Sequence, residues 1–225
     1  MRRLGTLAAI VILALLAGGG YTAVAGAAVY QDLNGGRQAL VAAQASMAAA
    51  AGSGDLAELQ STAVQLKTAE RHFNDAHTRS TSDPALRLLG GIPQAGRQLA
   101  ASTYLAAIGA DLSRAGEGAA AVAIQVADLK KKYAGRTLTA DDLQAALQDA
   151  QAIARTYSAS IQAISQQLRA AEAERGQVDT SQLLGPLKDA YDAADRALAE
   201  ANTSFRRYQD VRQVLSDSLG VQLPP

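Results

Sequence analysis

Apolar residues recur along most of this chain at alternating spacings of four and three positions. The pattern is clear between residues 140 and 174, where it comprises Leu143, Leu147, Ala150, Ala154, Tyr157, Ile161, Ile164, Leu168 and Ala171. A mean period of 3.5 residues places one narrow stripe of a helix against a partner helix in left-handed packing. Residues 94–133 and 186–219 repeat the pattern, and no segment shows sustained period-two alternation. The sequence therefore predicts an all-α protein.

Capping residues and helix breakers divide this pattern into helices. Asp55 follows a Gly-Ser-Gly turn, Asp83 precedes a proline, and Thr139 with Asp142 has the spacing of a capping box. The expected helices cover residues 35–51, 55–80, 94–133, 140–174 and 186–219. Short connections make consecutive helices antiparallel. We therefore expect residues 32–225 to form an elongated antiparallel bundle or coiled coil of four to five helices.

The N-terminal segment, residues 1–31, has a different character. Arg2 and Arg3 precede an uncharged, mostly apolar stretch from Leu4 to Gln31, which exceeds the roughly 20 helical residues that cross a bilayer. Positive charge on the short N-terminal side favours a cytoplasmic N-terminus. The sequence thus predicts a transmembrane helix or signal anchor that contacts the bilayer through residues 4–30. The protein would be a single-pass plasma-membrane protein with its bulk outside the cytoplasm.

A cleaved signal peptide is the alternative interpretation of the same segment. Its apolar region would be residues 4–17, and small residues at Ala23, Ala25 and Ala27 offer cleavage sites. Both interpretations place residues 32–225 outside the cytoplasm.

Composition narrows the function classes. Hydrophobic residues make up 48% of the chain but aromatic residues only 4%, since alanine supplies much of the total. This balance is typical of long, closely packed helices. Gly109 and Gly116, seven apart, would either allow backbones to approach still closer or mark a flexible place. The 21 basic and 21 acidic residues cancel, which gives no basic surface for nucleic acid. With no cysteine, thiol chemistry and thiolate metal sites are excluded.

Two segments that resemble chemical motifs have simpler explanations. Residues 91–98 have P-loop glycine spacing, but Arg97 and Gln98 replace the required Lys and Ser/Thr, and Pro93 suits the first turn of a helix. His72 and His77 are five positions apart, which points their side chains about 140° apart on a helix. We find no nucleophile motif and assign no catalytic, cofactor-binding or metal-binding residues, so we do not expect an enzyme.

One short motif is more distinctive. It lies between the second and third predicted helices and comprises Pro84, Arg87, Leu88, Leu89, Gly90, Gly91, Ile92, Pro93 and Gly96. This interhelical turn motif resembles a stretch in the N-terminal helical region of bacterial proteins assigned to domain of unknown function family 4012. The resemblance implies an N-terminal membrane helix, alanine-rich helices and a long helix that begins at Ile92-Pro93. Members of that family continue into a glycine-rich domain, which residues 1–225 do not include, and the family has no established activity or catalytic residues to carry over.

These observations lead to two functional hypotheses. The first is a non-enzymatic, membrane-anchored helical stalk or scaffold of a bacterial cell envelope, which presents a partner or a distal domain. Its partner would be an envelope protein or a second copy of the chain, and no small-molecule substrate is identified. The last predicted helix has more apolar residues than packing against one partner helix requires. Its candidate interaction surface consists of Phe205, Tyr208, Val211 and Val214. The second hypothesis is a ligand-sensing helical ectodomain that acts with a partner subunit.

Overall fold

The computed structural model describes the backbone of residues 2–53, 55–133 and 139–219, and most side chains between residues 25 and 209. Every element within these ranges is helical: α1 (Arg2–Ser53), α2 (Leu56–Ser82), α3 (Pro84–Gly90), α4 (Pro93–Tyr133), α5 (Ala140–Gly176), the 3-10 helix η1 (Thr180–Gln182) and α6 (Gly185–Leu219). The prediction of an all-α protein is confirmed.

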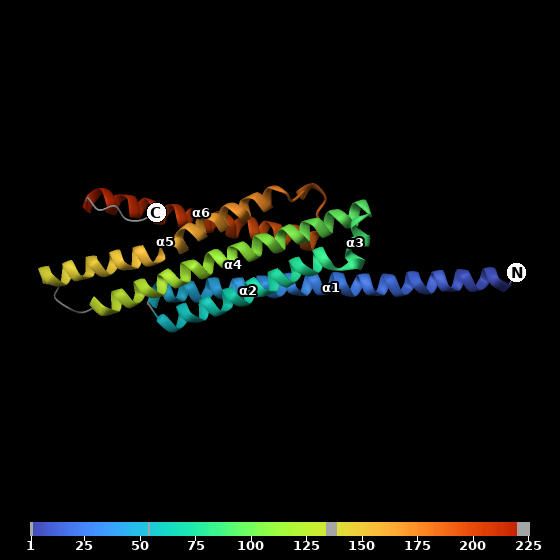
Figure 1. Ribbon diagram of the computed structural model, residues 1–225, viewed down its shortest axis with the longest axis horizontal. Helices are drawn as coiled ribbons and strands as arrows, with labels where there is room; N and C mark the ends of the chain where they lie inside the picture. The colour runs from blue at the N-terminus through green and yellow to red at the C-terminus, as the bar shows by residue number, and fades with distance from the viewer. Residues whose placement is uncertain (1, 54, 134–138, 220–225) are drawn as a thin grey trace.

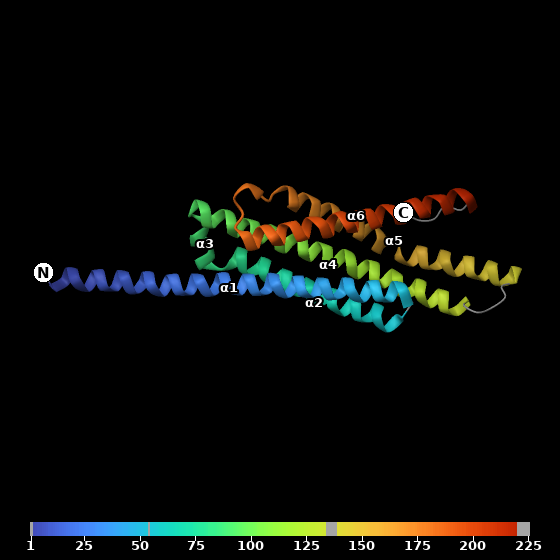
Figure 2. The ribbon, with the colours of Figure 1, turned by 180° about the vertical axis from the view of Figure 1, so that it is seen from behind.

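The five long helices run along one axis in alternating directions (Figure 1). Helix α2 packs against α1 and α4, α4 packs against α5, and α6 packs against α4 and, less extensively, α5. The N-terminal part of α1 extends beyond the other helices, and the last turns of α6 lie toward the opposite end (Figures 1 and 2). The predicted elongated helical bundle is therefore present.

The predicted caps form as side-chain hydrogen bonds. The Asp55 carboxylate accepts from the backbone N–H of Ala57 at 2.9 Å. Asp83 caps α3 by accepting from the backbone N–H of Ala85 at 2.8 Å. Thr139 and Asp142 form a capping box at the start of α5. Each cap satisfies N–H groups that have no partner inside the helix, and so sets where the helix begins.

The structure differs from the sequence prediction at two places. The predicted break between residues 31 and 35 is absent, because α1 is one helix of 52 residues. Glycines at positions 35 and 36 disfavour an isolated helix, but here they admit side chains of α2. A Cβ atom added at Gly36 would lie 2.8 Å from the ring of Phe73. The second difference is α3, a short helix that the sequence analysis described only as a turn motif.

Glycine also permits the close packing of α2 on α4. A Cβ atom at Gly109 would lie 2.6 Å from the Phe73 ring, and one at Gly116 would lie 2.8 Å from the Leu66 side chain. The prediction that Gly109 and Gly116 allow close approach is confirmed. The Phe73 ring is thus held between glycines of α1 and α4.

The predicted seams are buried over only part of their length. In α5, Ile161, Ile164, Leu168 and Ala171 belong to the largest buried cluster, together with residues of α4 and Leu198 of α6. Leu147 on the same seam is 39% exposed, and Val126 on the seam of α4 is 52% exposed. The helices therefore close a core toward the end from which α1 extends and diverge toward the other end.

The predicted membrane segment falls largely outside the described side chains, which begin at residue 25. No helix within the described part of the chain is both long and apolar enough to cross a bilayer. The last residues of the predicted segment pack into the bundle. Val29 is 4% exposed and shares a buried cluster with Leu86 and Ala106. Protein side chains therefore cover Val29, and the bilayer contact of residues 4–30 stays a prediction.

Candidate functional site

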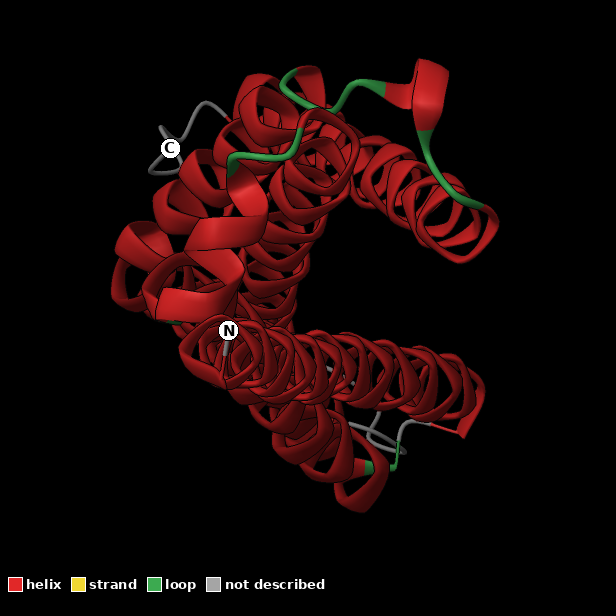
Figure 3. Ribbon diagram, turned by 90° about the vertical axis from the view of Figure 1, so that its right-hand side faces the viewer, coloured by secondary structure: helices red, strands yellow, loops and turns green. Residues whose placement is uncertain are grey.

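An apolar groove of about 1040 Å³ lies between α1 and α6. In the view along the bundle, α6 forms one arm of an open, C-shaped cross-section, and α1 with α2 forms the other (Figure 3). The lining of α1 runs from Tyr30 to Ala50, which at 1.5 Å per residue is about 30 Å. We call this feature the α1–α6 groove.

The floor of the α1–α6 groove is apolar, and its charges lie on the rim. The floor includes Leu105, Leu112, Ala115, Ile161, Ile164 and Leu168. The charged lining residues, Arg37, Arg196 and Glu200, are exposed. Gln44 of α1 donates a hydrogen bond to the Glu200 carboxylate of α6 at 3.3 Å, which links the two arms.

This arrangement suits apolar contact. A general acid or base needs a titratable group within a water-poor site, and the floor residues named above have no titratable side chain. Neither arginine of the rim forms an ion pair with a described residue. An apolar surface that binds in the groove would therefore be removed from water.

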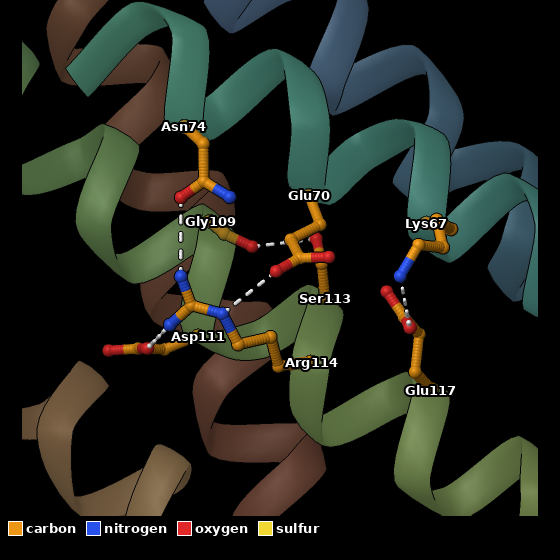
Figure 4. Close-up of polar contacts among 8 residues, drawn as sticks. All are labelled: Lys67, Glu70, Asn74, Gly109, Asp111, Ser113, Arg114 and Glu117. Carbon is orange, nitrogen blue, oxygen red and sulfur yellow. Dashed lines mark hydrogen bonds and ion pairs between the residues drawn. The ribbon is translucent and has the colours of Figure 1, made fainter. Parts of the chain in front are cut away.

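A second feature is a polar cluster between α2 and α4, on the seam that joins them (Figure 4). Arg114 of α4 donates from Nε to Glu70 of α2 at 3.0 Å and from Nη2 to Asn74 at 3.2 Å. Its Nη1 donates to Asp111 on its own helix at 2.8 Å. Three acceptors hold one guanidinium in place, so the cluster fixes the register of α2 against α4. We call it the α2–α4 polar cluster.

Glu70 and the neighbouring Glu117 of α4, which pairs with Lys67 at 3.8 Å, have opposite pKa shifts. Burial acts to raise the pKa of Glu70 above 4.5, but the hydrogen bond from Arg114 and the charges of Arg114 and Lys67 outweigh it, and the pKa is lowered. Burial raises the pKa of Glu117, and the negative charge of Glu70 raises it further. Burial also raises the pKa of Asp111, although Arg114 lies beside it. The fold therefore disfavours the charged forms of both Glu117 and Asp111.

We expect isosteric amides at these two glutamates to change stability in opposite directions. At neutral pH, Glu70→Gln should lower the free energy of unfolding by about 1 kcal/mol, because Arg114 loses a charged acceptor in a partly exposed pair. Glu117→Gln should leave stability equal or higher, since its ion pair with the exposed Lys67 spans 3.8 Å and is weak. Urea unfolding followed by circular dichroism measures both.

The pH dependence of the two stability changes tests whether the pKa shifts cause them. A lowered pKa in the folded state contributes stability above the ordinary pKa that is lost as pH falls, so the Glu70→Gln deficit should shrink in acid. A raised pKa has the opposite sign, so any gain from Glu117→Gln should be largest at neutral pH and fade as pH falls through the raised value. Equal losses from both substitutions would contradict this account.

The two histidines do not come together. The Nδ1 atom of His72 lies 3.9 Å from Asp32 of α1, whereas that of His77 lies 3.5 Å from the backbone oxygen of Thr103 on α4. Across the described residues, no group of three His, Cys, Asp or Glu side chains could hold a metal ion. The two imidazoles face different helices.

The interhelical turn motif forms α3 and the turn into α4. Pro84 is the first residue of α3, and Pro93 is the first residue of α4, as the sequence predicted. Leu89 packs against a buried cluster, whereas Leu88 is 79% exposed. A Cβ atom at Gly96 would lie 2.5 Å from the carbonyl oxygen of Gly90, so glycine there lets α3 approach α4. No strand leads into this segment, unlike a P-loop.

The candidate interaction surface on α6 is described only in part. Phe205 packs against the largest buried cluster and lines the α1–α6 groove. The side chains of Tyr208, Val211 and Val214 lie outside the described residues.

Sequence reasoning missed both the groove and the polar cluster. Glu70 and Arg114 are 44 positions apart, on different helices, and no local spacing connects them. The groove forms where the apolar stripes of the helices have no partner helix. A regular heptad pattern does not indicate where that happens.

The fold and the groove define an elongated helical bundle with an open apolar side. Comparisons with protein-family models, curated proteins and solved structures found no match.

Proposed function

We propose that this protein is a non-enzymatic, membrane-anchored stalk or scaffold of a bacterial cell envelope, with its bundle outside the cytoplasm. The observation that carries the proposal is the unbroken helix α1, from Arg2 to Ser53. A continuous helix transmits the direction of a membrane span into the bundle without a flexible linker. Residues 4–24 precede the described packing contacts, and at 1.5 Å per residue they would reach about 30 Å, the thickness of the hydrocarbon core.

The direction of the helices supports the role of a spacer. Helix α1 enters the bundle at one end, and the last turns of α6 lie toward the other (Figure 1). A partner or a distal domain held at the end of α6 would stand away from the bilayer. The proposed partner is an envelope protein or a second copy of the chain. The resemblance to the family 4012 helical region is in keeping with this role.

We expect the protein, isolated from the membranes of its own cells after an alkaline wash, to have the intact mass of the uncleaved chain, with residues 1–31 retained. A mass lower by about 2–3 kDa, with the protein released from membranes, would mean a cleaved signal peptide and would rule out the anchor. Intact-protein mass spectrometry distinguishes the two.

The side of the membrane is tested separately. The chain has no cysteine, so Gln162→Cys on the exposed face of α5 gives a single labelling site. A membrane-impermeant maleimide should label it in intact spheroplasts. Labelling only after lysis would place the bundle in the cytoplasm and contradict the proposal.

A ligand-sensing ectodomain is the second candidate, and the α1–α6 groove favours it. The groove lies at the upper end of the range of about 300–1,000 Å³ that small-molecule sites occupy. A small molecule that raised the melting temperature of the chain would support this function over the stalk.

A further inference from the structure

Four large apolar side chains are exposed at the end of the bundle from which α1 extends. Leu88 is 79% exposed, Tyr30 and Leu184 are each 56% exposed, and Ile92 is 52% exposed. They come from α3, from α1, from the link before α6 and from the turn between α3 and α4. Figure 1 shows α3 and the start of α4 at this end of the bundle. We call these four residues the end patch.

Packing within the bundle keeps the parts of the end patch together. The backbone N–H of Leu184 donates to the side chain of Gln98 at 3.2 Å, which holds the link before α6 beside the first turns of α4. The backbone N–H of Ile92 donates to the carbonyl of Leu89 at 2.9 Å, which fixes the turn after α3. These two bonds fix the backbone at Leu184 and at Ile92.

Contacts between α1 and α3 show which part of α1 this surface lies beside. Val29 of α1 and Leu86 of α3 belong to one buried cluster, and Ala25 and Leu89 pack against it. Helix α3 therefore lies beside residues 25–33 of α1. The proposed span ends near residue 24, so α3 lies just outside the hydrocarbon core, at the level of the head groups.

The exposed side chains of α3 are of the kinds that suit the surface of a bilayer. Leu86 and Leu89 face the protein, while the intervening Leu88 faces outward. Exposing a leucine to water is unfavourable, and the boundary between head groups and acyl chains removes that cost. Arg87 is exposed, and its Nε donates to the carbonyl of Thr81 at 3.1 Å, which leaves its terminal nitrogens able to bind phosphate. Tyrosine, as at Tyr30, is enriched at membrane interfaces.

We propose that the end patch contacts the surface of the bilayer that holds α1. Leu88 and Ile92 enter the boundary between head groups and acyl chains, and Arg87 lies at the level of the lipid phosphates. The contact assigns a role to the interhelical turn motif, and it sets the bundle upright on the membrane. It rests on the proposed membrane anchor, which the experiment below tests in parallel.

The experiment uses single-cysteine variants of the full chain in phosphatidylcholine–phosphatidylglycerol vesicles. Leu88→Cys and Ile92→Cys report on the patch, and each carries an environment-sensitive nitrobenzoxadiazole label. Leu13→Cys reports on the anchor. Val64→Cys is the matched control, since Val64 is 68% exposed but lies in the first third of α2, near the other end of the bundle. The quenchers are lipids with a nitroxide near the head-group end or near the methyl end of an acyl chain.

We expect labels at positions 88 and 92 to lose emission to the shallow nitroxide more than to the deep one, because interfacial side chains reach only about 5–10 Å into the boundary. The label at position 64 should keep its emission. Quenching at position 13 without quenching at 88 and 92 overturns the contact and leaves the anchor standing. An unquenched label at position 13 removes the anchor and the contact together. Equal quenching at position 64 means a bundle lying on the surface, and also overturns the proposal.

A second set of variants tests whether the apolar side chains cause the contact. The label is moved to Leu184→Cys. Adding Leu88→Glu and Ile92→Glu should then reduce quenching by the shallow nitroxide, because it is unfavourable to move a carboxylate into the boundary between head groups and acyl chains. Adding Val64→Glu in place of those two should leave the quenching unchanged. Unchanged quenching with both glutamates present contradicts the proposed role of Leu88 and Ile92.

Discussion

Replacing Phe73 with alanine should lower the free energy of unfolding by about 3–5 kcal/mol, the range for truncating a buried phenylalanine. The ring is 6% exposed and belongs to a buried cluster with Ala69 and Ala110. It lies between Gly36 of α1 and Gly109 of α4, so its loss opens a cavity where three helices meet. Urea unfolding of the full chain in a mild detergent, followed by circular dichroism, gives the value.

The effect of Gly109→Ala on stability should depend on whether the Phe73 ring is present. In the natural chain the new Cβ would lie 2.6 Å from Phe73, and the ring cannot retreat because Gly36 closes the other side. Overpacking of about 1–3 kcal/mol should outweigh the gain of up to about 1 kcal/mol from helix propensity. In the Phe73→Ala background only the propensity gain remains, so the same substitution should stabilise.

The sign change separates the pocket from a general effect of glycine. Gly176→Ala is the control, since an added Cβ there meets nothing within 4 Å, and it should leave stability equal or slightly higher in both backgrounds. If Gly109→Ala had the same effect with and without the ring, the pocket would not be the reason for glycine at position 109.

Truncating two leucines of the same seam should have unequal effects. Leu147 and Leu168 lie on α5 at the same heptad position, three heptads apart. Leu168 is 3% exposed within the largest buried cluster, and Leu147 is 39% exposed. Leu168→Ala should cost about 2–5 kcal/mol, and Leu147→Ala less than about 1 kcal/mol, because less apolar area leaves water there.

This pair tests whether the helices diverge in solution as they do in the structure. Since the residue type, the helix and the substitution are the same, helix propensity cancels and only burial differs. Equal losses at both positions would mean that the seam of α5 closes along its whole length, and the divergence of the helices at that end would then be wrong.

Local sequence was sufficient for three of the long helices and for the starts of α2, α3 and α5. The 3.5-residue period predicted α4, α5 and α6, because a stripe of apolar residues at that spacing is buried only in helices packed side by side. Asp55, Asp83 and Thr139 predicted helix starts, since a capping side chain bonds backbone groups two or three residues away. Each of these interactions is complete within a few residues of chain.

Other features depended on residues far apart in the sequence. Gly35 and Gly36 disfavour a helix locally, yet α1 continues through them because side chains of α2 occupy the space that glycine leaves. The opposite pKa shifts of Glu70 and Glu117 arise from charges that two helices bring together. Neither effect has a signature in the local pattern.

The sequence by itself determined that the chain is helical, where most helices begin, and which stripe of each helix is apolar. Only the tertiary structure decided which parts of those stripes find a partner. A heptad pattern specifies the face that a helix buries but carries no information on how far two helices stay in contact. That distance depends on shape matches such as the Phe73 ring between two glycines, and these matches exist only once the helices are packed.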